Sequence, residues 1–147
     1  MTAVSGTVLG FDYGAKRVGV AVGETSTGIA NPLGAIEGEA NAARFAAIDK
    51  YVGEWHPVAL VVGQPRHSDG SEHDVARLAG KFARRLAGRY KLEVVLVDET
   101  LTSATAEAEL RATRTRPARK TDVDALAAAL ILQSFLDRQE GHERLAP

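Results

Sequence analysis

The sequence contains no cysteine among its 147 residues, few aromatic side chains (5%) and no long apolar run. The absence of cysteine excludes disulfides and thiolate metal sites, and it suits a reducing compartment. The longest apolar run, residues 125–132, is far short of the roughly 20 residues that span a bilayer, and residues 1–7 carry no leader pattern. We therefore expect a cytoplasmic protein without a membrane partner.

The charge balance also lacks an excess of either sign, since the formal net charge is −1. A protein that binds nucleic acid over its whole surface is usually basic, so any such partner must be held by a local patch. The low aromatic content argues against a platform on which bases stack. Contacts to a nucleic-acid backbone and to its shape fit this composition better.

The 45% hydrophobic content of the chain is enough for one buried core. Periodicity predicts strands over residues 8–13 and 17–22, a third, poorly delimited strand before residue 37, and a helix from residue 41 to Pro57. Further along, a strand over 58–62, a helix from residue 71, a strand over 92–97, a short helix to about residue 112 and a helix over 122–138 follow. We expect one domain over residues 1–138 and a flexible tail over 139–147.

This order of elements predicts an α/β fold with a mixed five-stranded sheet flanked by helices. Three strands would be antiparallel and two parallel, joined by right-handed crossovers. The same order is found in the ribonuclease-H-like fold. A fold does not by itself identify a function.

Acidic residues stand at three separate places that such a fold can bring together. Asp12 lies inside an apolar strand, where a carboxylate needs compensation, although it could also be a turn aspartate. Glu99 follows Asp98 at a strand end, where ligands of parallel sheets bind, although a solvated strand end is equally compatible. Asp122 and Asp124 open the last helix, where a capping box of Thr121 with Asp124 would explain them.

Taken together, these acids predict a metal site. Two Mg²⁺ or Mn²⁺ ions bridged by carboxylates can cut a phosphodiester, because one activates water and the other stabilises the leaving oxygen. Oxygen ligands are those that Mg²⁺ prefers.

Two groups of cations could contact a polyanion. One is a stretch without acids directly before the acidic helix start, which could hold a nucleic-acid backbone or be a solvated linker. It contains Arg111, Arg114, Arg116, Arg119 and Lys120. The other group lies on the second helix and is interpreted as an ordinary charged outer face. It contains Arg77, Lys81, Arg84, Arg85 and Arg89.

Four ordered stretches resemble the YqgF family, also called RuvX-like resolvases. The first is Gly-Phe-Asp-Tyr-Gly-Ala-Lys-Arg-Val-Gly-Val-Ala-Val-Gly at residues 10–23. The others are residues 62–65 with Asp69-Gly70, residues 98–103, and residues 122–134, so the resemblance covers nearly the whole chain. The sequence departs from the family pattern at Thr100, where arginine is usual, and at Gln64, where leucine is usual.

The resemblance implies a ribonuclease-H-like fold and a nuclease that matures the 5′ end of the 16S ribosomal RNA precursor. A role as a Holliday junction resolvase is the alternative. The implied catalytic metal ligands are Asp12, Glu99 and Asp124, with Asp122 as a substitute for Asp124. Candidates for substrate contacts are Lys16, Arg17, Arg66, Arg114, Arg116, Arg119 and Lys120.

Two further interpretations belong to other classes of protein. Residues 12–19 also look like the first phosphate loop of actin-like ATPases, but those enzymes clamp ATP between two such domains. The chain could also be a non-catalytic RNA-binding assembly factor. The sequence leaves open whether the protein is a monomer or a homodimer.

Overall fold

The computed structural model describes residues 3–64, 70–98 and 119–147, with the side chains of residues 70–73 excepted. Three strands open the fold: β1 (Thr7–Tyr13), β2 (Arg17–Glu24) and β3 (Ile29–Glu37). They are followed by α1 (Asn41–Trp55), β4 (Ala59–Gln64), α2 (Gly70–Tyr90), β5 (Glu93–Asp98), α4 (Lys120–Asp137) and β6 (Glu143–Leu145). None of the helices described is long and apolar enough to cross a membrane.

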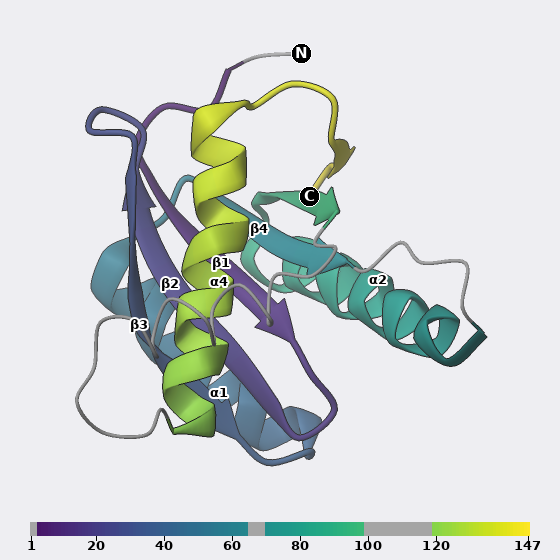
Figure 1. The fold of residues 1–147 in the computed structure, drawn as a ribbon. Coiled ribbons are helices and arrows are strands. Elements are labelled where there is room, and N and C mark those ends of the chain that lie inside the picture. Colours follow the sequence, from purple (N-terminus) through teal and green to yellow (C-terminus); the bar gives the residue numbers. More distant parts are fainter. Residues whose placement is uncertain (1–2, 65–69, 99–118) are drawn as a thin grey trace.

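The strands form one mixed sheet in the order β3-β2-β1-β4-β5-β6. β1, β4 and β5 are parallel, whereas β2, β3 and β6 each run antiparallel to a neighbour. α4 crosses one face of this sheet, and α1 and α2 cover the other (Figure 1). The mixed α/β sheet flanked by helices is therefore confirmed, but it has six strands among the described residues instead of the five expected.

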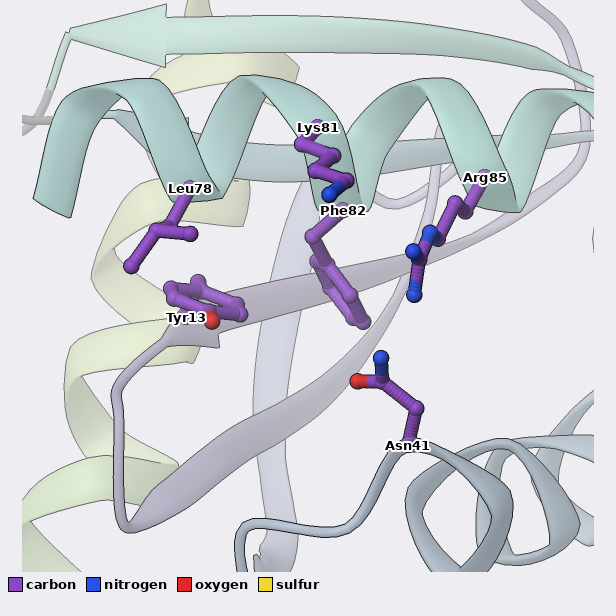
Figure 2. Close-up of a pocket in the computed structure, with 6 residues that line it drawn as sticks. All are labelled: Tyr13, Asn41, Leu78, Lys81, Phe82 and Arg85. Atoms are coloured by element: carbon purple, nitrogen blue, oxygen red, sulfur yellow. The ribbon is translucent and has the colours of Figure 1, made fainter. Parts of the chain in front are cut away.

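Strand alternation explains the two layers, because successive side chains point to opposite faces. In β1, Leu9 and Phe11 belong to the core beneath α1 and α2, whereas Val8 belongs to the core beneath α4. The ring centroids of Tyr13 and Phe82 lie 5.2 Å apart, which continues the first core to the end of β1 (Figure 2). Asp12 therefore lies on the face that α4 covers.

Small residues allow α4 to pack directly on the backbone of β1 and β2. A Cβ atom added at Gly10 would lie 2.8 Å from Leu132 Cβ, and one at Gly23 would lie 2.8 Å from Leu136 Cδ1. Ala128 of α4 is fully buried against the same face. The glycines in β1 and β2 therefore set how closely α4 approaches the sheet.

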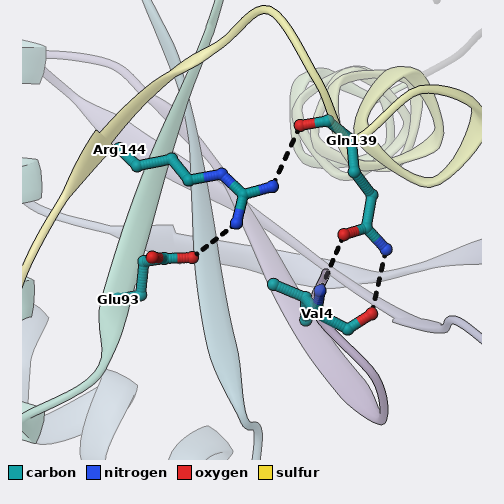
Figure 3. A network of polar contacts seen from close by, with 4 residues as sticks. All are labelled: Val4, Glu93, Gln139 and Arg144. Atoms are coloured by element: carbon teal, nitrogen blue, oxygen red, sulfur yellow. Dashed lines mark hydrogen bonds and ion pairs between the residues drawn. The ribbon is translucent and has the colours of Figure 1, made fainter. Parts of the chain in front are cut away.

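Residues 139–147 are not the free tail that we expected. Residues Glu143–Leu145 form β6, which pairs antiparallel with β5. The Gln139 side chain accepts a hydrogen bond from Val4 N at 2.7 Å and donates one to Val4 O at 2.9 Å. Arg144 bonds Glu93 Oε1 at 3.0 Å and the Gln139 carbonyl at 3.1 Å (Figure 3). A three-residue strand whose partner is about 50 residues away gives no local sequence signal.

Candidate metal and phosphate site

Asp12 lies near the carboxyl end of β1 with a glycine on each side of it in the sheet. Its register partner in β2 is Gly19, and its partner in β4 is Gly63. Glycine has no side chain, so neither register partner places a side chain directly opposite the half-buried Asp12. Asp12 therefore lies on the α4 face between two strand positions that carry no side chain.

The lack of a side chain at Gly19 also lets the backbone of α4 approach β2 next to Asp12. A Cβ atom at Gly19 would lie 2.0 Å from the backbone oxygen of Asp124 and 2.5 Å from its carbonyl carbon. The first turns of α4 therefore rest on the β2 backbone directly across from Asp12. The fold thus gathers Asp12 and Asp124, which are more than a hundred residues apart in the sequence, on one patch of the sheet.

Arg17 compensates the charge of Asp124. Arg17 Nε and Asp124 Oδ2 are 2.5 Å apart, and the two side chains are 25% and 21% exposed. A charge-assisted contact of this kind holds both side chains in one geometry. Arg17, a candidate for substrate contacts, is therefore engaged with a predicted metal ligand.

The two aspartates of α4 have different surroundings. Asp122 accepts a hydrogen bond from the backbone N–H of Arg119 at 3.3 Å, so it caps the helix that begins at Lys120. The cap expected from Thr121 with Asp124 is wrong, because the helix starts two residues earlier than the pattern indicated. Asp124, which makes no part of this cap, contacts Arg17 over the sheet.

The predicted third ligand, Glu99, lies outside the described residues. Its neighbour Asp98 ends β5 in alternation with Val94 and Leu96, whose side chains point to the α1 and α2 face. Asp98 therefore lies on the face opposite to Asp12. Within the described ranges no group of three or more His, Asp or Glu residues could hold a metal ion. Of the three carboxylates expected to hold the metal, Asp12 and Asp124 lie within the described residues, on the same face of the sheet.

Comparison with known proteins identifies the family of the chain. Residues 6–138 match a family model described as "RuvX: Holliday junction resolvase". The chain belongs to the RuvX family. The family predicted from the sequence is thereby confirmed.

Relatives in the RuvX family share about half of their residues with this chain. One from Dechloromonas aromatica (strain RCB), named "putative pre-16S rRNA nuclease", is 54% identical over 133 residues, covering 90% of this chain and 91% of that protein. One of the same name from Thiobacillus denitrificans (strain ATCC 25259 / T1) is 53% identical, covering 90% and 92%. These names agree with the nuclease predicted from the sequence.

Solved structures show the same fold at lower identity. "T. thermophilus RuvC in complex with Holliday junction substrate" matches with a TM-score of 0.58 and 17% identity, covering 95% of this chain and 99% of that one. "Thermus thermophilus RuvC structure" matches with a TM-score of 0.55. RuvC has a ribonuclease-H-like fold, so the fold predicted for this RuvX-family chain is confirmed.

Apart from Arg17, the cations expected to contact substrate either lie beside the predicted site or fall outside the described residues. Lys16 is exposed in the turn between β1 and β2, and Arg119 and Lys120 are exposed at the start of α4. These residues border the elements that carry Asp12 and Asp124. Arg66, Arg114 and Arg116 lie outside the described residues.

Sequence reasoning missed Arg44 of α1, which is only 2% exposed. Its Nε donates to the Gly38 carbonyl at 2.7 Å, and its Nη2 donates to the carbonyls of Gly14 at 2.7 Å and Ala15 at 2.6 Å. Arg44 therefore ties the turn that follows Asp12 to the start of α1. Its position four residues before the buried Ile48 was the available signal, because such spacing places both on one helix face.

The departure from the family pattern at Gln64 has a structural explanation. The Gln64 amide donates a hydrogen bond from Nε2 to the Ala76 carbonyl of α2 at 2.8 Å. A Cβ atom at Gly80 would lie 3.3 Å from the same nitrogen, so a small residue there leaves room for the amide. Gln64 thus joins β4 to α2 by a hydrogen bond that a leucine could not make.

Proposed function

We propose that this RuvX-family chain is a metal-dependent nuclease that hydrolyses phosphodiester bonds in 5′-end maturation of precursor 16S ribosomal RNA. The observation that carries the proposal is the contact of α4 with Gly19, which gathers Asp12 and Asp124 on one face of the sheet. The names of the relatives support the substrate. The proposal includes a cytoplasmic location, because a nuclease that matures a ribosomal RNA precursor would act where that precursor is processed.

The donor set fits Mg²⁺ or Mn²⁺. Carboxylate oxygens are hard ligands, and Asp12 and Asp124 would hold the metal together with Glu99. When bound, two such ions activate water and neutralise charge on the leaving oxygen. Asp122 is the weaker candidate, because its carboxylate caps α4.

The other residues of the site would orient a metal ligand or hold phosphates of the substrate. Arg17 fixes the Asp124 carboxylate through the contact at 2.5 Å. Lys16, Arg119 and Lys120 would hold the phosphates of the strand beside the scissile bond, as charge at these positions attracts a polyanion without reading its sequence. Arg66, Arg114 and Arg116 are further candidates for this role.

The test compares cleavage of a precursor ribosomal RNA fragment by wild type and by Asp12→Asn and Asp124→Asn, with Mg²⁺, with Mn²⁺ and with EDTA. We expect metal-dependent cutting that falls at least about 100-fold in either variant, since even outer-shell partners of a metal cost about 10- to 100-fold. Asp137→Asn is the matched control, because Asp137 lies on α4 thirteen residues from Asp124, about 20 Å along the helix.

A four-way DNA junction tests the second candidate function. The family description and the likeness to RuvC favour a Holliday junction resolvase as the alternative. Cutting of the junction and not of the RNA would replace the proposed substrate while keeping the metal site. If purified wild type cuts neither with any metal, the nuclease proposal is wrong and an RNA-binding assembly role takes its place.

A further inference from the structure

A small basic cavity lies on the face of the sheet opposite to Asp12. Its volume is about 80 Å³, and it lies between α1, α2 and the end of β1. Figure 2 shows Arg85 extending from α2 towards Asn41 at the start of α1, with Lys81 one helical turn away. The cavity is lined by Tyr13, Asn41, Leu78, Lys81, Phe82 and Arg85.

The described residues that line this cavity carry charge of one sign. Lys81 and Arg85 are cations, and none of the described lining residues is an acid. Lys81 and Arg85 are four residues apart on α2, where like charges repel each other by about 0.2–0.5 kcal/mol. Within the described part of the chain, no ion pair or hydrogen bond engages either side chain. By contrast Arg89, one turn further along α2, is paired with Asp49 of α1 at 2.7 Å.

The size and chemistry of the cavity select a small anion. Sites for drug-sized molecules occupy about 300–1,000 Å³, so this cavity cannot enclose a base with its sugar. Asn41 adds an amide group, and the first turn of α1 contains no acidic residue, so the helix dipole also favours an anion. Phe82 and Tyr13 form an apolar wall, which lowers the local dielectric around a bound charge.

We propose that the cavity binds a phosphate group of the nucleic acid, away from the bond that is cut. Identifying the source as nucleic acid rests on the proposed function, whereas the anion site itself does not. Tyr13 follows Asp12 directly in β1, so the cavity and the metal site lie at the same end of the sheet on opposite faces. A strand passing over this end can contact both. The five cations of α2 are thus not one uniform outer face, because two of them line a cavity.

The first experiment titrates inorganic phosphate into ¹⁵N-labelled protein without added metal. We expect saturable shifts of the Asn41 and Phe82 amide signals in wild type, and their loss in Lys81→Ala and in Arg85→Ala. Arg84→Ala is the matched control, because Arg84 is an exposed cation on the same helix that does not line the cavity. Absence of saturable shifts in wild type would overturn the proposal.

The second experiment measures RNA affinity by fluorescence anisotropy in the Asp12→Asn background, using strands with a 5′-phosphate and strands with a 5′-hydroxyl. Each cavity variant should weaken binding about three- to fivefold and lower the salt slope by about 0.7, the value for one single-strand phosphate contact. An effect on both strands identifies an internal phosphate, and an effect on the 5′-phosphorylated strand alone identifies a terminal one. If Arg84→Ala weakens binding as much as Arg85→Ala, the overall positive charge of α2 and not the cavity binds the RNA, and the proposal is wrong.

The outcomes of the two proposals are separable. Phosphate binding needs neither metal nor cleavage, so it can be present in a protein that cuts nothing. Conversely, metal-dependent cutting by wild type would keep the proposed function even if the phosphate titration fails.

Discussion

Replacing Gly19 by alanine adds one methyl group where β2 meets α4. That Cβ would lie 2.0 Å from the Asp124 oxygen, whereas real Cβ contacts essentially never fall below 3.0 Å. The obstructing atoms belong to the helix backbone, so no side-chain rotation relieves the overlap. The start of α4 must therefore move by at least about 1 Å, the shortfall between these two distances, as expected when a close-packed interior is overfilled.

The energetic cost follows from two opposing effects. Overpacking costs about 1–3 kcal/mol, and the lower entropy of the unfolded chain with alanine returns about 0.4–1 kcal/mol. We expect a net loss of about 1–2 kcal/mol, which lowers Tm by roughly 2–8 °C in a chain of this length. The effect on cleavage is larger, because a displacement of about 1 Å at a catalytic group can cost about 100-fold in rate.

Both effects can be measured on one preparation. Urea unfolding followed through Trp55, the single tryptophan, gives the stability, and metal-dependent cleavage gives the activity. Gly53→Ala is the control, because nothing lies within 4 Å of a Cβ atom at that exposed helical position. It should gain about 0.5–1 kcal/mol and keep full activity. Unchanged stability and cleavage in Gly19→Ala would refute the close contact of α4 with β2.

Two further predictions concern the helices on the other face. Arg44→Met leaves three carbonyls without their hydrogen-bond donor and should lower the free energy of unfolding in urea by about 3 kcal/mol. Arg44→Lys should restore only part of that stability, because an ammonium cannot reach all three carbonyls. Equal stability of Arg44→Met and wild type would contradict this. Hydrogen bonds from Arg89 and Tyr90, with the charge of Arg89, lower the pKa of Asp49 from 3.8 to about 2. A lowered carboxyl pKa stabilises the fold above about pH 4 and loses that effect as pH falls towards 2. Wild type should therefore unfold at a higher urea concentration than Asp49→Asn at pH 4, and this difference should shrink towards pH 2. A difference that stays constant over this range would contradict the lowered pKa of Asp49.

Most of the elements could be predicted because their signals are local. The alternation in residues 7–13 and the helical spacing of Phe45, Ile48 and Val52 depend only on near neighbours in the chain. Errors arose where local patterns compete or where no local pattern exists. The sequence pattern puts the start of α4 two residues late, because both Asp122 and Asp124 can complete a capping box. It gives no sign of β6, because the pairing of β6 is entirely long-range.

The sequence by itself determined the α/β class, the family and the acidic character of the site, since these depend on residue types, spacing and order. It could not show that Asp122 caps α4 while Asp124 contacts Arg17, or that Lys81 and Arg85 face a shared cavity. Those features depend on which surfaces meet when α4 closes on Gly19 and α2 packs beside α1. Contacts between distant segments leave no periodic signal in the chain, so only the tertiary structure decided them.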